Sequence, residues 1–571
     1  MLRTAGRVGA AALRAGVSRP VVARQSLSSL AAFATVDPAT LSGSTPHTVL
    51  NLLDGKWVGS EDYTILPDPL NGEPFLQVAE TSSQEAEAFV RSLKTCPKHG
   101  LHNPIKNPER YLVYGDVTAK AAALMREPKV EDFFVRLIQR VAPKSYAQAL
   151  GEVTVTRRFL ENFSGDNVRF LAKSFSVPGD HPGQVSTGHR WPYGPVAIIS
   201  PFNFPFEIPM LQVMGALYMG NKVVFKTDSK VSVVMEQAIR MLLECGLPHK
   251  DLDFINCQGD IMHRLLLAAQ PRVTQFTGSS RVAEALARDL HGKVRVEDAG
   301  FDWKILGPDV SDEEYVAWTC DQDAYAFSGQ KCSAQSILFV HEAWEKAGLL
   351  KRLEELAARR TLEGLTVGPV LTVTTQQCME HIQNLLKISG AKLLFGGQPL
   401  QGGRHSSPEC YGAWEPTAVF VPLKEMLATP EAFALCTTEI FGPFQVVTTY
   451  AADEEALVLE ACEAMKNHLT AAVVSNNVHF QNRVLGATVN GTTYCGIRAR
   501  CDRCARARAC LCVRERFFVC LLYMGALCFR ARGVRACAFW MGAPSSHNRV
   551  QTTVLERYST VLYFRKYCTV L

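Results

Sequence analysis

A cysteine with the features of a nucleophile lies in the segment 327–335, FSGQKCSAQ. Cysteine attacks carbon as the thiolate, and a neighbouring cation favours that form. Lys331 directly precedes Cys332, Ser333 follows it, and a glycine-bearing turn leads in. The chain holds eighteen cysteines, so a buried structural thiol is the competing interpretation of Cys332. The other motifs along the chain favour the interpretation of Cys332 as a nucleophile.

Other motifs accompany Cys332 in a fixed order. They are Asn203 in SPFNFP, Lys226 after an apolar run, FTGS at 276–279, Glu297 at the end of KVRVE, and EIFGPF at 439–444. Together, in this order, they resemble the aldehyde dehydrogenase superfamily over residues 48–497. The resemblance implies an α/β protein with a Rossmann-like NAD-binding domain and an α/β catalytic domain.

This resemblance implies a catalytic set for the oxidation of an aldehyde to an acid. Cys332 would attack the carbonyl carbon, and the oxyanion would be held by the Asn203 amide and the Cys332 backbone N–H. Hydride would pass to NAD, and Glu297 would deprotonate the water that hydrolyses the thioester. Taken alone, Glu297 also fits a solvated surface carboxylate. No metal is expected in this site.

The same resemblance implies where NAD would bind. Gly278 stands before an expected helix, where backbone amides attract pyrophosphate, although a single Gly-Ser pair is also a common helix cap. Lys226 would bond the adenine ribose, and Ser229 stands where many relatives place a ribose-binding glutamate. Glu439 and Phe441 would contact the nicotinamide ribose and ring. The full expected set is Ser200, Phe202, Lys226, Ser229, Gly278, Ser279, Val282, Glu439 and Phe441.

Alternating strands and helices are expected to position these residues between 194 and 290. The runs GPVAIIS, KVVFK, LDFIN and RVTQF predict strands, and helical segments follow each of them. Such spacing indicates a parallel sheet with right-handed crossovers, which binds ligands at the carboxyl ends of its strands. The motifs at 200–203, 226–229 and 277–279 fall at those ends.

The α/β pattern continues beyond residue 298, where VGPVL, KLLFGG, TAVFV and TAAVVS predict further strands. We therefore expect an NAD-binding domain over 35–297 and a catalytic domain over 298–475 that presents Cys332 to it. Residues 476–497 are expected to return to the NAD-binding domain. At 571 residues the chain is long enough for both cores.

The first 34 residues carry five arginines and no acid. Rich in alanine and serine, this segment is typical of an organellar transit peptide, and we interpret it as mitochondrial. A plastid address and a disordered basic terminus are the alternatives.

Charge and cysteine are concentrated at the C-terminal end. Residues 498–571 hold fourteen Lys and Arg against three acids, whereas residues 1–497 hold 46 against 52, a net charge of −6. The basic balance therefore gives no indication of a nucleic-acid-binding body. No apolar run reaches the roughly 20 residues of a membrane-spanning helix. Ten cysteines scattered through the first 497 residues suggest reduced thiols.

Long phrases narrow the resemblance within the superfamily. CPKHGLHNP, RLIQRVAPKSY, EDAGFDWK and CDQDAYAFSGQKCSAQS resemble the plant-type branch that oxidises glutamate semialdehyde. The resemblance implies a mitochondrial matrix enzyme of proline breakdown that forms glutamate with NAD. Lys331 and Ser333 would help to hold the amino-acid end of the substrate; simple turn packing is the alternative for both. Another semialdehyde remains an alternative substrate.

The segment 498–571 departs from the superfamily pattern. It lacks the Pro-Phe-Gly-Gly stretch that grips the substrate and the strand used in subunit pairing, and its Arg- and Cys-rich composition indicates an aberrant C-terminus that does not fold. A zinc site at Cys501, Cys504, Cys510 and Cys512 is an alternative, although the spacing lacks a second CxxC. The family implies a homo-oligomer, which this C-terminus puts in question, and an impaired or inactive relative is the alternative function.

Overall fold

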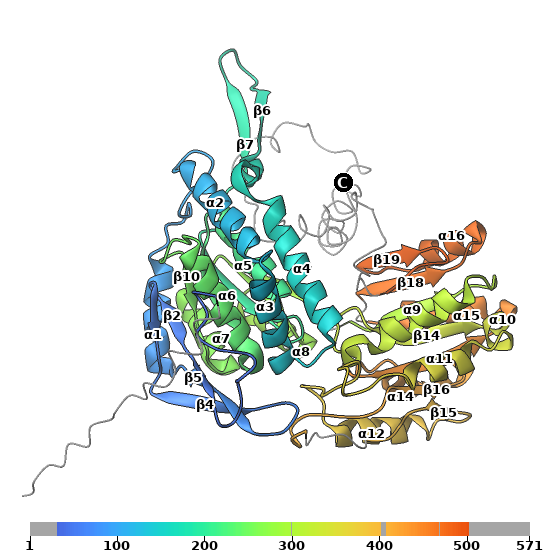
Figure 1. Ribbon diagram of the computed structural model, residues 1–571. Coiled ribbons are helices and arrows are strands. Elements are labelled where there is room, and N and C mark those ends of the chain that lie inside the picture. The colour runs from blue at the N-terminus through green and yellow to red at the C-terminus, as the bar shows by residue number, and fades with distance from the viewer. Residues whose placement is uncertain (1–30, 299, 401–406, 467–468, 502–571) are drawn as a thin grey trace, which may run out of the picture.

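Two seven-stranded sheets organise the protein. The computed structural model describes residues 31–298, 300–400, 407–466 and 469–501. Within them, helices cover both faces of each sheet, and the two sheets form separate halves of the molecule (Figure 1). The α/β class predicted from the alternation of strands and helices is confirmed.

The first sheet has the order β12-β11-β8-β9-β10-β2-β3. The five strands β8 to β12 pair in parallel. β2 pairs antiparallel with β10, and β3 forms an antiparallel hairpin with β2. The predicted runs in 194–290 are strands in the structure. The strands are β2 (Asn51–Leu53), β3 (Lys56–Val58), β8 (Pro195–Ser200), β9 (Lys222–Thr227), β10 (Leu252–Phe254), β11 (Val273–Thr277) and β12 (Val294–Glu297).

Alternate residues of the central strands bury into two different helical layers. Val196 and Phe225 face the layer of α2 (Glu109–Leu124), α3 (Pro128–Val141), α4 (Tyr146–Asn162), α5 (Glu207–Tyr218) and α6 (Ser232–Glu244). Ala197 and Val224 face the layer of α1 (Ser83–Lys94), α7 (Gly259–Ala269) and α8 (Ser280–Asp289). Because both faces are covered, these strands are continuous apolar runs, and this is why they were recognisable in the sequence.

The second sheet has the order β15-β16-β17-β14-β13-β18-β19. All neighbouring strands are parallel except β15, which pairs antiparallel with β16. Its strands are β13 (Asp302–Leu306), β14 (Gln335–His341), β15 (Lys392–Phe395), β16 (Thr417–Phe420), β17 (Phe444–Tyr450), β18 (Thr470–Val474) and β19 (Thr492–Cys495).

Helices again form two layers on this sheet. One core joins alternate strand residues to α9 (Glu313–Tyr325), α10 (Glu342–Lys346) and α11 (Leu349–Ala357). The opposite core joins them to α12 (Thr375–Leu385), α13 (Leu423–Met426), α14 (Pro430–Cys436), α15 (Glu455–Ala464) and α16 (Val478–Ala487). The nucleophile segment connects α9 to β14, the central strand of this sheet.

Two expectations about the second half are wrong. Residues 476–497 do not return to the first sheet, because β19 pairs in parallel with β18 from Thr470↔Thr492 to Val473↔Cys495. The run VGPVL at 367–371 is not a strand; Val370 makes only an isolated bridge to Gly412. Pro369 in its centre has no N–H to donate to a ladder.

Smaller elements complete the described part. A three-stranded sheet β1-β5-β4 comprises β1 (His47–Val49), β5 (Pro74–Glu80) and β4 (Asp62–Pro67), and a hairpin of β6 (Ser174–Pro178) and β7 (Val185–His189) projects from the first half (Figure 1). The last four described residues pack on the second half, where Ala499 and Cys501 are buried. Of the predicted leader 1–34, residues 1–30 lie outside the described residues, whereas Phe33 and Ala34 are buried in the core of the first half. The tail from residue 502 also lies outside the described residues, and so do the zinc-ligand candidates other than Cys501.

Candidate active site

The segment before Cys332 has a constrained backbone. It is a 3-10 turn, Ala326–Gly329, in which Phe327 and Ser328 have φ values of +54° and +51°. Side-chain-bearing residues adopt this region at a cost, so neighbouring contacts must hold them there. Gly329 also has positive φ, and a Cβ at this position would lie 2.0 Å from the Gly442 carbonyl oxygen. The glycine-bearing turn noted in the sequence therefore has a steric reason.

Hydrogen bonds to a neighbouring loop fix this segment. Ser328 Oγ accepts from the Gly368 N–H at 2.8 Å. Gln330 donates from Nε2 to the Pro369 carbonyl at 3.0 Å and accepts from the Leu371 N–H at 2.9 Å. Ser328 and Gln330 are both buried. The turn that leads into Cys332 is thus held by three hydrogen bonds to residues 368–371.

Glu297 meets Cys332 across the two halves. It is the last residue of β12, paired with Thr277 of β11, and its carbonyl oxygen accepts from the Gly278 N–H at 3.1 Å. The Cys332 thiol donates a hydrogen bond to the Glu297 carboxylate. A nucleophile from the second half and a base from the first are therefore in direct contact, and this pair is the centre of the candidate site.

The surroundings of Cys332 favour the neutral thiol. Burial raises the pKa of Cys332 well above its ordinary value, and the negative charges of Glu297, Asp302 and Glu439 raise it further. The expectation that Lys331 favours the thiolate is wrong in this arrangement. The Lys331 ammonium instead donates to the Gln322 carbonyl of α9 at 3.3 Å, and its side chain is buried. Cys332 therefore needs a base, and Glu297 is placed to accept the proton.

Asn203 lies beside the nucleophile segment. It follows β8, it is buried, and its Nδ2 donates to the Gln330 carbonyl oxygen at 3.2 Å. An amide nitrogen carries two hydrogens, so this bond orients the second one. The structure thus brings the three expected catalytic residues, Asn203, Glu297 and Cys332, to one place.

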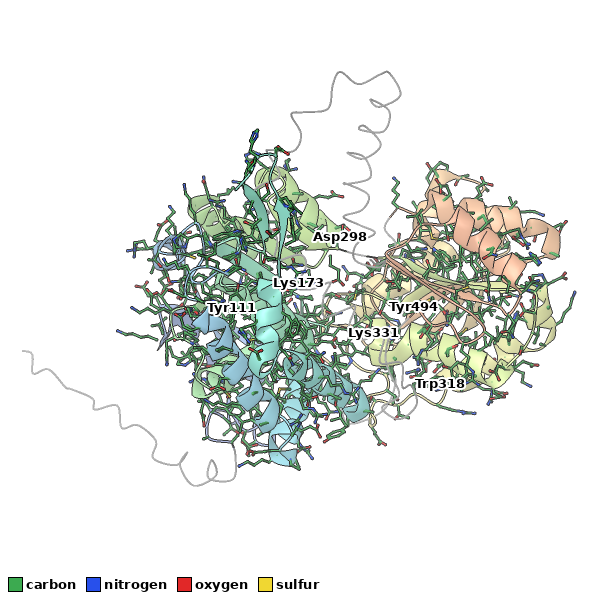
Figure 2. All side chains as sticks on the ribbon, turned by 90° about the horizontal axis from the view of Figure 1, so that it is seen from above. Tyr111, Lys173, Asp298, Trp318, Lys331 and Tyr494 are labelled. Atoms are coloured by element: carbon green, nitrogen blue, oxygen red, sulfur yellow. The ribbon has the colours of Figure 1, made fainter. Side chains whose placement is uncertain are left out.

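Two expected cofactor residues, Phe202 and Phe441, contact each other. Their ring centroids are 5.9 Å apart in an edge-to-face arrangement, which joins the loop after β8 to EIFGPF. Glu439 in the same motif accepts from the Gly300 N–H, and burial, reinforced by the charges of Asp302 and Asp298, raises its pKa to about 8. Lys331, Glu439 and Phe441 line one pocket. Figure 2 shows Asp298 and Lys331 in the region between the two halves.

The remaining cofactor candidates lie at the carboxyl ends of strands in the first sheet. Ser200 ends β8, and its Oγ is buried without a hydrogen-bond partner. Lys226 near the end of β9 donates to the Thr227 carbonyl oxygen at 3.1 Å. Gly278 and Ser279 follow β11, and Ser279 caps α8 without a side-chain bond to it. Ser229 begins a 3-10 turn after β9, Val282 is partly exposed on the first turn of α8, and Ser333 is half-buried beside Cys332.

Asp302 is a residue near this site that the sequence reasoning missed. It is fully buried at the start of β13, and Oδ1 accepts from the backbone N–H groups of Leu469 and Thr470 at 3.0 and 2.5 Å. Burial, with the charge of Glu297, raises its pKa to about 7. The only signal in the sequence was its place in EDAGFDWK, five residues after Glu297.

Neither a membrane-spanning helix nor a metal-binding cluster is found among the described residues. None of their helices combines the length and the apolar character that crossing a membrane would require. Nor do three or more His, Cys, Asp or Glu side chains of the described ranges gather in a way that would hold a metal ion.

The fold agrees with what a family comparison finds. Residues 57–503 match the model of the aldehyde dehydrogenase family. This match covers well over half of the chain. The chain therefore belongs to the aldehyde dehydrogenase family.

Individual relatives are similar over most of the chain. The Δ1-pyrroline-5-carboxylate dehydrogenase 12A1, mitochondrial, of Arabidopsis thaliana is 64% identical over 468 residues, which are 82% of this chain and 84% of that protein. A protein of Linum usitatissimum named probable aldehyde dehydrogenase is also 64% identical over 468 residues, with the same coverage. Similarity at this level gives no support to the alternative of an inactive relative.

Solved structures share the fold. A 1-pyrroline-5-carboxylate dehydrogenase from Thermus, solved with bound NAD, superposes with a TM-score of 0.65 at 24% identity and covers 80% of this chain and 86% of that one. An NAD-dependent aldehyde dehydrogenase from Sinorhizobium meliloti gives a TM-score of 0.67 at 23% identity, with 81% and 88% coverage. The expectation of an aldehyde dehydrogenase fold is confirmed.

Proposed function

We propose that the chain oxidises L-glutamate 5-semialdehyde, the open form of 1-pyrroline-5-carboxylate, to L-glutamate with NAD, in proline catabolism in the mitochondrial matrix. The single observation that carries the chemistry is the hydrogen bond from the Cys332 thiol to the Glu297 carboxylate. The substrate rests on the 64% identity to the Arabidopsis relative named for pyrroline-5-carboxylate.

The first step is the attack of Cys332 on the aldehyde. Its thiol proton passes to Glu297 as the sulfur–carbon bond forms, and the carbonyl π electrons move to oxygen. The free Nδ2 hydrogen of Asn203 and the Cys332 backbone N–H stabilise that oxyanion. Since the pKa of Cys332 is raised, transfer of the proton to Glu297 is part of the attack and does not precede it.

The residues present fit a dinucleotide. Ser200 Oγ is buried without a hydrogen-bond partner at the end of a strand. A Cβ at Gly278 would lie 2.6 Å from the Phe276 ring, so the position before α8 favours glycine. The N-terminus of α8, with its helix dipole, suits a pyrophosphate. Lys226, Ser229, Ser279 and Val282 would line the adenosine side, and Phe202, Glu439 and Phe441 the nicotinamide side. NAD, when bound, supplies the acceptor for the aldehyde hydride.

The second half-reaction is hydrolysis of the thioester at Cys332. Glu297 first releases the thiol proton to solvent and then takes one proton from a water molecule, whose oxygen bonds to the acyl carbon. The carbon–sulfur bond breaks with the electron pair going to sulfur. The proton returns to sulfur, and glutamate leaves. One carboxylate therefore serves both half-reactions, which explains why it contacts the thiol directly.

Ser333 and Lys331 are proposed to support the amino-acid end of the substrate. Ser333 is half-buried at the site, and the Lys331 ammonium would act on the carboxylate only after leaving the Gln322 carbonyl. We further propose NAD-binding residues within 35–297, a catalytic unit from 298 that includes β19, and a homo-oligomeric assembly.

A panel of aldehydes tests the proposal. The purified full chain is expected to form NADH fastest with glutamate semialdehyde, and more slowly with an aldehyde of equal length that lacks the α-amino acid end. Equal kcat/KM for both would contradict the proposed substrate while leaving the aldehyde chemistry intact.

A further inference from the structure

Lys144 is a buried cation next to the oxyanion residue. It lies between α3 and α4, and only 1% of its side chain is exposed. Its ammonium donates to Glu152 Oε2 at 2.9 Å and to the Asn203 carbonyl oxygen at 2.7 Å. It also lies over the rings of Phe204 and Phe327, at 4.6 and 4.0 Å from their centroids. Every described contact of the ammonium is thus with Glu152 or with one of the two loops of the site.

Glu152 binds the same loop from its other oxygen. Oε1 accepts from the Phe206 N–H at 2.8 Å and from the Glu207 N–H at 3.1 Å. Glu207 opens α5, where the first amides have no acceptor within the helix and the helix dipole favours a carboxylate such as Glu152. Lys144 and Glu152 together hold the backbone of residues 203–207 at both ends.

The pair also reaches the nucleophile segment. Phe327 is one of the two non-glycine residues with positive φ in the turn before Cys332, and its ring lies 6.2 Å from that of Phe204, edge to face. A cation over both rings restrains the two loops relative to each other. Asn203 Nδ2 and the Gln330 carbonyl meet across this junction.

We propose that Lys144, with Glu152, is a positioning residue for the oxyanion donor: it fixes the Asn203 backbone and the Phe327 ring so that the Asn203 amide and the Cys332 sulfur face one carbonyl group. The inference rests on the proposed role of Asn203. A buried ion pair contributes little net stability compared with apolar side chains of similar volume, so stability alone does not explain it.

The test replaces both charges at once. In Lys144→Met/Glu152→Gln no buried charge is left unpaired, and the glutamine oxygen can still accept from the Phe206 and Glu207 amides. The matched control is Lys222→Met/Asp253→Asn. Lys222 and Asp253 are a second buried ion pair, with 3.9 Å between their charged atoms, and Lys222 begins β9, at the end of the strand opposite to the site residue Lys226. The readout is the NADH burst of the first turnover with glutamate semialdehyde, measured alongside the rate at which iodoacetamide alkylates Cys332.

Asn203→Ala is expected to slow the burst about 100-fold, the effect of losing one oxyanion donor. The Lys144/Glu152 variant is expected to slow it about 10- to 100-fold through misplacement of the amide. Adding Asn203→Ala to that variant should slow it no further than Asn203→Ala alone, because both changes remove one interaction. Alkylation should stay within about twofold of wild type in the Lys144/Glu152 and control variants, and so should the control burst.

Three results would count against parts of this account, and they are distinguishable. A normal burst in the Lys144/Glu152 variant, or full multiplication of its effect with that of Asn203→Ala, would overturn the positioning role. A normal burst in Asn203→Ala would instead overturn the proposed oxyanion donor. Should the paired variant not fold, Lys144→Arg keeps the buried charge beside Glu152 and changes the donor that holds the Asn203 carbonyl, and an effect that multiplies with that of Asn203→Ala would again overturn the inference.

Discussion

Asp302 holds a carboxyl group whose ionisation is expected to make the protein less stable as the pH rises. Its Oδ1 accepts two backbone N–H groups, whereas its Oδ2 is buried without a hydrogen-bond partner. Burial raises its pKa to about 7. The folded protein therefore keeps a proton, between about pH 4 and pH 7, that the unfolded chain has already released.

The size of this effect follows from the shift. An ordinary aspartate has a pKa of about 3.9, so the folded state shifts it by about three units, and each unit corresponds to about 1.4 kcal/mol. Ionisation of Asp302 should lower the free energy of unfolding by about 4 kcal/mol once the pH exceeds 7. Below about pH 4 the penalty is absent, since both states are then protonated.

Asp302→Asn mimics the protonated side chain and removes the titration. Its urea unfolding, followed by tryptophan fluorescence, should show a gain over wild type that grows by about 2 kcal/mol between about pH 5.5 and 8.5. Asp116→Asn, at an exposed aspartate of α2, is the control and should show no such growth. A difference between Asp302→Asn and wild type that is constant over this range would refute the reasoning.

Three further predictions concern the site. Glu439 is proposed to bind the hydroxyls of the nicotinamide ribose, and its pKa is raised to about 8. If it binds them as the carboxylate, the Kd for NAD should fall about tenfold between about pH 7 and 9 in wild type and stay flat in Glu439→Gln; calorimetry at both pH values tests this. Glu297→Gln removes the base that takes the proton of the Cys332 thiol and then that of the water, so the first-turnover NADH burst should slow about 100-fold and steady NADH formation should stop; an unchanged burst would contradict the role of Glu297 in the attack. Lys226→Ala should raise KM for NAD about 10-fold or more without changing kcat, through loss of a charged hydrogen bond; a fall in kcat alone would count against its placement.

Much of the fold was predictable because its strands are buried on both faces. The runs GPVAIIS and KVVFK, which predict strands, are β8 and β9 in the structure. Ser200 and Lys226, two of the expected site residues, lie at the carboxyl ends of these strands. VGPVL has the same composition, but Pro369 and the local chain path leave only one isolated bridge. The pairing of β19 with β18 depends on contacts between the two strands, which a motif order does not encode.

The site was predictable in its residue types and not in its electrostatics. The order of the motifs in the sequence predicted that Asn203, Glu297 and Cys332 belong to one site. The direction of the Lys331 side chain could not be predicted, because it depends on the packing of α9 beside it. Lys144 lies 59 residues before Asn203, and only the fold brings its ammonium onto that carbonyl. Buried charges of this kind have no local signature, because the partner that makes them tolerable is remote in sequence.

The central claim is that this chain oxidises glutamate semialdehyde through Cys332. The most direct measurement is NADH formation, with glutamate determined in the same sample, by the purified full chain and by Cys332→Ser. The account predicts equal amounts of NADH and glutamate from the wild-type chain and neither from the variant, whose hydroxyl Glu297 cannot activate as it does a thiol. Turnover by Cys332→Ser at the wild-type rate, or no NADH from the wild-type chain, would contradict it.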